Sequence, residues 1–231
     1  MRALLLAAGR GTRLGRITEH TPKCLVKIGD TPLLDVWIFR LAMAGFTEVL
    51  LNTHHLAPTV ETHVGTAKYP IRVTTSFERE LLGTAGTIEA HRSWLEADDT
   101  LVAHADNFTL FDIRDFVTAH HNRPPQTIMT MLAFRTDTPA TCGILDVDPE
   151  GVLRNMWEKS PEEHGNLANA AVYMFSPSIV REVRGAFDFS LDVIPRYFGK
   201  IQVVATEKVH IDIGNPEALS RAQRYAAEIT L

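Results

Sequence analysis

Residues 1–23 read MRALLLAAGRGTRLGRITEHTPK, and this stretch decides how the fold is interpreted. A short apolar run leads directly into a loop that contains Gly9 and Gly11. Because glycine has no side chain, the backbone N–H groups of such a loop can turn toward a phosphate. Arg13 and Lys23 add positive charge to the same segment. The stretch therefore predicts a buried strand followed by a binding loop for a nucleoside triphosphate.

Other glycine-rich loops fit this stretch less well. A dinucleotide fingerprint, Gly-x-Gly-x-x-Gly, requires glycine at position 14, where this chain has Leu14. A Walker loop requires Gly-Lys-Ser/Thr, which does not occur here. Gly9 and Gly11 by themselves also fit a turn that needs glycine only for its backbone geometry.

Size and composition limit the class of protein. The chain has 231 residues, 45% hydrophobic and 22% charged, which is ordinary for a soluble α/β protein of one or two domains. A net charge of -5 argues against broad nucleic-acid binding. No apolar run approaches the roughly 20 residues of a membrane helix, and no signal peptide is evident. Cys24 and Cys142 lack metal-type spacing, which favours a reduced, cytoplasmic compartment.

Apolar runs of strand length alternate with amphipathic stretches, and this alternation predicts a mainly parallel sheet with helices on both faces. Strands are expected at 3–7, 48–52, 71–75, 100–104 and 127–133. Helices are expected after a Thr31 cap, at 84–94 and at 112–121. After Pro139 the pattern predicts a hairpin (143–147 and 152–158), strands at 168–175 and 201–205, and helices at 177–183, 190–197 and 216–229.

The run LAAGRGTRL at 6–14, with Pro22-Lys23 beyond it, resembles the signature loop of the sugar-phosphate nucleotidyltransferases, which make nucleotide sugars. The resemblance extends over essentially the whole chain. It implies an α/β, Rossmann-like fold of the nucleotide-diphospho-sugar transferase type, with a mainly parallel mixed sheet. It also implies a single domain, 1–231. About 1–138 would bind the nucleotide, and about 139–231 would bind the sugar phosphate and end in a closing helix.

The resemblance also implies a nucleotide site. Arg13 and Lys23 would neutralise the triphosphate and act in catalysis. Gly83 would let the base approach, although Gly83 and Thr84 also fit an ordinary helix N-terminus with Thr84 as its cap. The implied nucleotide-binding residues are Leu6, Ala7, Ala8, Gly9, Gly11, Thr12, Glu78, Gly83 and Thr84.

Two carboxylates match the metal positions of the same family. Asp106 follows an apolar strand, and Asp212 precedes a helix that starts at Pro216. Each by itself also fits a solvated turn. Two carboxylates with substrate phosphates are a typical arrangement for Mg²⁺, so the resemblance implies a catalytic Mg²⁺ held by Asp106 and Asp212.

The later part of the chain matches the family's sugar-phosphate residues. Glu158 would accept hydrogen bonds from sugar hydroxyls, Lys159 would pair with the phosphate, and Asn169 would bridge hydroxyls. Glu158-Lys159 also fits an exposed strand end with solvated charges. The implied sugar-phosphate residues are Asn107, Gly143, Glu158, Lys159 and Asn169.

Glu78 bears on the choice of base. An ionised carboxylate only accepts hydrogen bonds, so it suits guanine, which presents N1–H and an amino group side by side. Uracil and thymine present one imide N–H between two carbonyls, which a carboxylate repels. This favours GTP if Glu78 faces the base rather than solvent.

The expected activity is condensation of an NTP, with GTP favoured, and a sugar 1-phosphate into a nucleotide-diphospho-sugar and pyrophosphate. The tract 142–173 is closest to mannose- or heptose-1-phosphate guanylyltransferases. Alternatives are a uridylyl-, thymidylyl- or cytidylyltransferase, and a regulatory subunit that binds a nucleotide sugar without catalysis. No nucleic-acid or membrane partner is expected, and a homo-oligomer stays open.

Overall fold

The structure, a computed structural model, describes residues 1–181 and 183–229. The chain divides into two compact units, each built from segments that are distant in sequence. The first unit consists of Met1–Leu81, Ala103–Leu110 and Val209–Leu231. The second consists of Leu82–Val102 and Phe111–Lys208. The functional division of a single domain near residue 138 stays a prediction.

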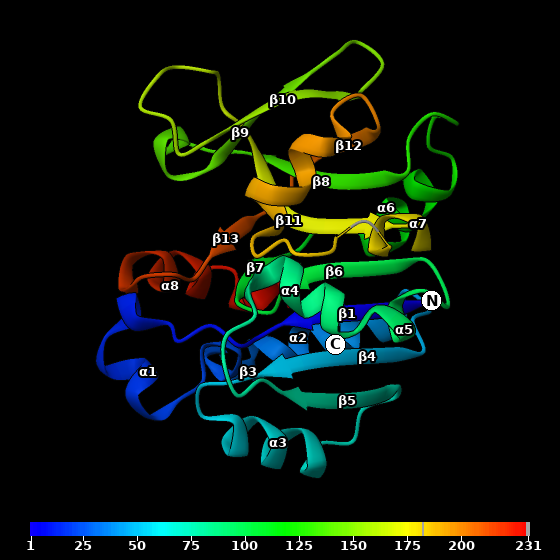
Figure 1. Cartoon of the computed structure of the whole chain (residues 1–231). Coiled ribbons are helices and arrows are strands. Elements are labelled where there is room, and N and C mark those ends of the chain that lie inside the picture. The colour runs from blue at the N-terminus through cyan, green and yellow to red at the C-terminus, as the bar shows by residue number, and fades with distance from the viewer. Residues whose placement is uncertain (182, 230–231) are drawn as a thin grey trace. The chain divides into compact units, whose positions relative to one another are not determined.

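The first unit is organised around three parallel strands. These are β1 (Arg2–Leu6), β4 (Glu48–Thr53) and β5 (Arg72–Phe77), with β4 in the middle (Figure 1). Apolar side chains of β1 and β4 are buried in the core. Parallel strands end at the same edge, so the segments that follow β1, β4 and β5 lie close together.

Helices complete the first unit: α1 (Arg16–His20), α2 (Leu33–Met43), α3 (Ala57–Thr66) and α8 (Pro216–Gln223). The sequence did not predict α3, which packs beside β5 (Figure 1). Asp35 of α2 accepts hydrogen bonds from Tyr69 Oη at 2.5 Å and from His63 of α3 at 2.7 Å. This shared carboxylate ties α3 to α2.

Two predicted helix ends are wrong. Thr31 does not cap α2, because Thr31–Pro32 form strand β3 against β2 (Lys27–Ile28), and Pro32 is the N-cap. The last predicted helix is two shorter ones, α8 and a 3₁₀ turn at Ala226–Glu228. The start of α8 is as expected, since Pro216 lies in its first turn and the Asn215 side chain accepts from Ala218 N–H.

The second unit contains a mixed sheet. Strand β8 (Met129–Arg135) pairs antiparallel with β11 (Leu167–Phe175) and parallel with β12 (Ile201–Thr206). The predicted hairpin forms as β9 (Gly143–Val147) and β10 (Leu153–Glu158), and Ile144 of β9 pairs with Ala168 of β11. The strand β6 (Thr100–His104) has residues in both units.

The helices of the second unit are shorter than predicted. The stretch 84–94 forms α4 (Gly83–Ala90) and α5 (Arg92–Leu95). The stretch 190–197 forms a π turn and a 3₁₀ turn, since Pro195 has no N–H to continue a helical ladder. Helix α6 (Ile113–His121) starts as expected, capped by Asp112. Helix α7 covers Pro177–Val180 of the predicted 177–183, of which residue 182 lies outside the described residues.

A bulge interrupts β11 close to a predicted site residue. The pairing register with β8 shifts between Asn169 and Tyr173, and Ala171 adopts a left-handed φ of 51°. Asn169 Oδ1 accepts a hydrogen bond from Ala171 N–H at 2.9 Å. The bulge therefore fixes the position of the Asn169 side chain at the cost of strain at Ala171.

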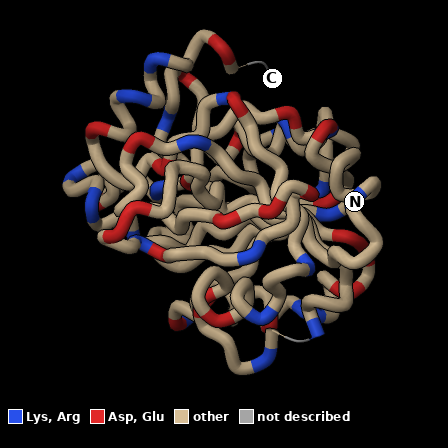
Figure 2. The backbone as a smooth tube through the Cα atoms, turned by 90° about the horizontal axis from the view of Figure 1, so that it is seen from above, with Lys and Arg blue, Asp and Glu red and all other residues tan. Residues whose placement is uncertain are grey.

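The fold class is as predicted: a mixed α/β protein with a mainly parallel sheet flanked by helices. Among the described residues, basic and acidic residues are interspersed along the backbone (Figure 2). Within that same part of the chain, no helix combines the length and apolarity needed to cross a bilayer.

We predict that Ala171→Gly stabilises the protein by about 1 kcal/mol, because glycine removes the penalty of a left-handed alanine. The matched control is Ala170→Gly, since Ala170 is buried on the same strand without a positive φ. Ala170→Gly should lower the free energy of unfolding by about 1 kcal/mol. Urea unfolding of the three proteins measures both effects, and a destabilised Ala171→Gly variant contradicts the prediction.

Candidate active site

In the glycine loop after β1, the packing of neighbouring residues requires glycine at only one of the two glycine positions. Gly11 has a φ of 64°, and a Cβ there would lie 2.9 Å from Thr18 Cγ2 and 3.3 Å from Lys23 Cβ. The Thr18 hydroxyl donates to Gly11 O at 2.8 Å. Gly9 is exposed, and a Cβ at that position would meet no atom within 4 Å. Gly11 is therefore required by packing, whereas packing does not require Gly9.

The two predicted metal carboxylates lie together. Strand β7 (Asn107–Thr109) pairs antiparallel with β13 (His210–Asp212), and Asp212 lies opposite Asn107. Ile213 N–H also donates to Asp106 O at 3.3 Å. This small ladder brings together two aspartates that are about a hundred residues apart in the sequence.

Lys23 lies between these carboxylates. Its Nζ is 2.5 Å from Asp106 Oδ2 and 2.8 Å from Asp212 Oδ1. The Lys23 side chain is only 8% exposed, so its charge needs these partners. Burial by itself lowers the pKa of Lys23, but Asp106 and Asp212 outweigh burial and the pKa is raised. Burial likewise opposes ionisation of Asp106, yet Lys23 keeps its pKa below the usual value. Lys23 and Asp106 are therefore both charged.

Arg13 lies at the exposed side of this cluster. Its Nη2 is 3.6 Å from Asp212 Oδ2, and its side chain is 72% exposed. A Cβ at Gly214 would lie 2.9 Å from Arg13 Nη2 and 3.0 Å from Asp212 Oδ2. The sequence analysis did not select Gly214, which lies close to both Arg13 and Asp212. Its signal was the glycine two positions after Asp212.

Mg²⁺ fits this donor set. The described residues contain no group of three or more His, Cys, Asp or Glu side chains that could enclose a metal ion. Two hard carboxylate oxygens that already share one cation are suited to Mg²⁺, which takes few protein ligands and adds water and phosphate oxygens.

Glu78, the predicted base-reading residue, is 5% exposed and does not point to solvent. It follows β5, and its backbone N–H donates to Thr53 O at 2.8 Å. Its carbonyl contacts His54 Nδ1 at 2.9 Å. Its carboxylate accepts from Asn52 Nδ2 at 2.9 Å. Sequence reasoning missed Asn52, although a polar residue near the end of the apolar run EVLLN was a usable signal.

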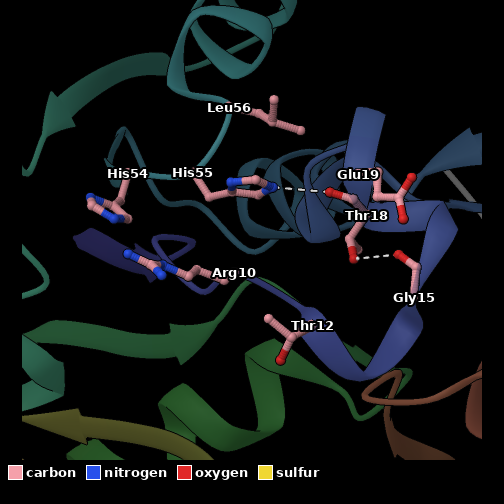
Figure 3. Close-up of a pocket in the computed structure, with 8 residues that line it drawn as sticks. All are labelled: Arg10, Thr12, Gly15, Thr18, Glu19, His54, His55 and Leu56. Carbon is pink, nitrogen blue, oxygen red and sulfur yellow. Dashed lines mark hydrogen bonds between the residues drawn. The ribbon is translucent and has the colours of Figure 1, made fainter.

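A pocket of about 510 Å³ opens beside the glycine loop (Figure 3). His54 and His55 both line it. His55 Nε2 lies 3.0 Å from Thr18 O, and Arg10 extends toward His54 (Figure 3). The lining residues are Arg10, Thr12, Gly15, Thr18, Glu19, His54, His55 and Leu56. Of the predicted nucleotide-binding residues, only Thr12 is among them.

The second unit contains two predicted nucleotide residues, Gly83 and Thr84. A Cβ at Gly83, whose φ is 75°, would collide with the carbonyl oxygen of Phe187. Thr84 Oγ1 accepts from Phe189 N–H at 2.7 Å, and it does not cap α4. Packing against 187–189 thus explains both residue types within this unit, and their contact with a base stays a prediction.

Four of the five predicted sugar-phosphate residues also belong to the second unit. A Cβ at Gly143 would lie 2.6 Å from Glu158 Oε2, so glycine allows this carboxylate to fold over β9. Glu158 Oε1 is 3.3 Å from Lys159 Nζ, and the Lys159 side chain is 67% exposed. Asn169 Nδ2 donates to Tyr173 Oη at 2.8 Å. Burial raises the pKa of Tyr173 to about 12, so its hydroxyl stays protonated.

Asn107, the fifth predicted sugar-phosphate residue, belongs to the first unit and is 5% exposed. Its carbonyl accepts from Trp37 Nε1 at 2.9 Å, which anchors β7 to α2. Its contact with a sugar phosphate stays a prediction.

Comparison with known proteins assigns the chain to a family. The family model described as nucleotidyl transferase matches residues 2–228. The chain therefore belongs to the nucleotidyl transferase family.

Two curated relatives are similar in sequence. A mannose-1-phosphate guanyltransferase of Pichia angusta is 33% identical over 192 residues, covering 78% of this chain and 50% of the relative. A glucose-1-phosphate thymidylyltransferase of Streptomyces antibioticus is 30% identical over 215 residues, covering 93% of this chain and 58% of the relative. The chain thus spans little more than half the length of these two relatives.

Solved structures share the fold. A putative glucose-1-phosphate thymidylyltransferase from Bacillus anthracis has a TM-score of 0.89 at 21% identity, covering 100% of this chain and 97% of its own. HddC from Yersinia pseudotuberculosis, solved in complex with GMP-PN, has a TM-score of 0.81 at 25% identity, covering 96% of this chain and 98% of its own.

We predict that His210 makes the protein less stable in mild acid. Burial first, and nearby His104 second, lower the pKa of His210 to about 3. The unfolded chain takes up this proton near pH 6.5 and the folded chain does not, so stability falls as the pH drops from 6.5 toward 3. Wild type should lose about 2 kcal/mol of unfolding free energy at this site between pH 7 and pH 5, and His210→Asn should not. The stability of the variant relative to wild type should therefore rise by about 2 kcal/mol over this range.

Urea unfolding of both proteins at the two pH values measures this difference. A stability difference between variant and wild type that is the same at pH 7 and pH 5 contradicts the prediction.

Proposed function

We propose that this protein transfers a nucleotidyl group from a nucleoside triphosphate to a sugar 1-phosphate, with release of pyrophosphate. The observation that carries the proposal is the contact of Lys23 with Asp106 and Asp212 in the unit that holds the glycine loop. Membership of the nucleotidyl transferase family supports the reaction class. The product would be a nucleotide-diphospho-sugar, and the role would be in nucleotide-sugar biosynthesis.

The reaction needs no protein nucleophile, because the acceptor phosphate is already an anion. One of its oxygens attacks the α-phosphorus, a new P–O bond forms, and the bond to pyrophosphate breaks. The work of the protein is positioning and charge stabilisation. Arg13 and Lys23 would hold the triphosphate and then the departing pyrophosphate. Lys159 would pair with the acceptor phosphate, while Glu158 and Asn169 bind sugar hydroxyls.

Asp106 and Asp212 would hold Mg²⁺, which supplies charge neutralisation at the reacting phosphate. Both carboxylates already share a cation, Lys23, which keeps the pKa of Asp106 below its usual value. If Lys23 moves to the triphosphate, its place at the carboxylates becomes available to a cation. In this proposal a positive charge balances the aspartates throughout.

GTP is the favoured donor. Glu78 is buried and accepts a hydrogen bond from Asn52, which agrees with an acceptor-only carboxylate facing guanine. The Pichia angusta relative and the HddC complex with GMP-PN support guanine. The Streptomyces antibioticus relative supports dTTP as the second candidate.

A pyrophosphate-release assay with Mg²⁺ tests the function. The panel is GTP, dTTP, UTP, CTP and ATP, each against mannose, glucose and heptose 1-phosphates. GTP should give the highest kcat/KM. A preference for dTTP or UTP would reject only the assignment as a guanylyltransferase. Absence of turnover with every combination of NTP and sugar 1-phosphate would reject the proposed reaction.

We predict that Asp106→Asn lowers turnover at least a hundredfold while the fold is retained. The change removes one negative charge at the position proposed for Mg²⁺ and leaves the size of the side chain unchanged. The control is Asp30→Asn, an exposed residue of the same unit, which should keep full activity. Circular dichroism verifies folding, and normal turnover by a folded Asp106→Asn variant contradicts the assignment.

We also predict that Lys23→Met binds Mg²⁺ at least tenfold more tightly than wild type when no nucleotide is present. The variant leaves two adjacent carboxylates without their shared ammonium, so a cation is more strongly favoured there. Titration calorimetry with Mg²⁺ alone, together with the rise in melting temperature on adding Mg²⁺, measures the effect.

The comparison variant for this experiment is Arg13→Met. Arg13 is an exposed and more distant partner of Asp212, so its loss should change Mg²⁺ affinity much less. Unchanged or weaker Mg²⁺ binding by Lys23→Met would show that Lys23 does not compete with the metal.

A further inference from the structure

The side chain of Asn52 is a buried amide near the end of the central strand of the first unit. Asn52 is 3% exposed and lies on β4, opposite Leu6 of β1 and Ser76 of β5. The residues before it on β4 are apolar and mostly buried. A buried amide is costly unless its donors and its acceptor are hydrogen-bonded, so an asparagine here needs a structural or functional reason.

The hydrogen bonds of Asn52 determine which way the amide points. Ala7 N–H lies 2.6 Å from Asn52 Oδ1, and a backbone N–H can only donate. The oxygen of the amide must therefore face Ala7. The amide nitrogen then faces Glu78 Oε1 at 2.9 Å, and it can only donate to it.

Asn52 consequently connects two predicted nucleotide-binding segments. Ala7 begins the glycine loop after β1, and Glu78 is the predicted base-reading residue after β5. The Glu78 backbone is held separately, through Thr53 O and His54. Asn52 contacts the carboxylate itself.

We propose that Asn52 is a positioning residue for nucleobase selection, because its amide holds the Glu78 carboxylate as a hydrogen-bond acceptor. The inference rests on the proposed function. The Asn52 amide donates at Oε1, so this oxygen acts as an acceptor and the orientation of the carboxylate is fixed. The ionised form accepts from the two adjacent donors of guanine and repels the carbonyls of uracil and thymine.

Two substitutions distinguish the effects of the two hydrogen bonds that the Asn52 side chain makes. Asn52→Asp keeps an acceptor for Ala7 N–H but replaces the donor that faces Glu78 with a carboxylate. Asn52→Leu removes both bonds at similar volume. The control is Thr53→Val, which removes a buried hydroxyl at the next position of β4 without touching the Glu78 carboxylate.

The experiment measures the binding of GTP, UTP and dTTP by calorimetry, and kcat and KM for each. In both Asn52 variants, we expect the affinity for GTP to fall at least tenfold. The affinities for UTP and dTTP should change less than threefold, and kcat at saturating GTP should stay within threefold. Thr53→Val should keep the wild-type preference. Melting temperatures establish that each variant is folded.

A double variant tests whether Asn52 acts through Glu78. In a Glu78→Ala background, Asn52→Leu should cause no further change in the ratio of GTP to UTP affinity. An equal loss for all three nucleotides, a wild-type preference in Asn52→Asp, or additive effects in the double variant would overturn the proposal.

The failure of the proposed function is a separate outcome. A wild-type chain that binds none of the three nucleotides overturns the function and this inference together. A wild-type chain that prefers GTP while both Asn52 variants keep that preference overturns the inference alone.

Discussion

The ion cluster of Lys23, Asp106 and Asp212 is the interaction on which the first unit depends. A nearly buried ammonium is stable only with close, charged partners, and loss of one partner leaves an uncompensated charge. The three residues come from three separate segments of the chain. The cluster thus binds the glycine loop to the β7 and β13 ladder. It also brings together the two carboxylates that are proposed to hold a divalent cation.

The parallel strands β1, β4 and β5 supply the second constraint. Because they end at one edge, polar groups that follow them meet without any long-range motif in the sequence. Asn52 is the clearest example, since its amide reaches both Ala7 and Glu78. Strands β1 and β4 are mainly apolar and buried, and the polar side chain of Asn52 lies near the end of β4. The chemistry proposed for the unit lies at that edge of the sheet.

Glycines and residues with a left-handed backbone occur in this protein for different physical reasons. At Gly11, Gly83 and Gly143 a side chain would strike neighbouring atoms, so the chain itself demands glycine. Gly9 has no such neighbour, so packing does not explain the glycine at that position. Ala171 shows the opposite case, because a left-handed residue is tolerated without glycine where the Asn169 side chain holds the backbone.

The sequence by itself determined the fold class and most strand positions, and it singled out Lys23, Asp106 and Asp212 as candidate site residues. Periodicity is local, and the motifs are restrictive, so both can be recognised without coordinates. Only the tertiary structure decided that Lys23 pairs with both aspartates, that Asn52 holds Glu78, and that Gly83 packs against Phe187. These contacts join residues far apart in the chain, and no local pattern encodes a distance between them. The start of α2 was also decided by the structure, because Thr31–Pro32 pair with Lys27–Ile28 and this pairing outweighs intrinsic helix propensity. The break near Pro195, by contrast, follows from a missing backbone N–H that the sequence already shows.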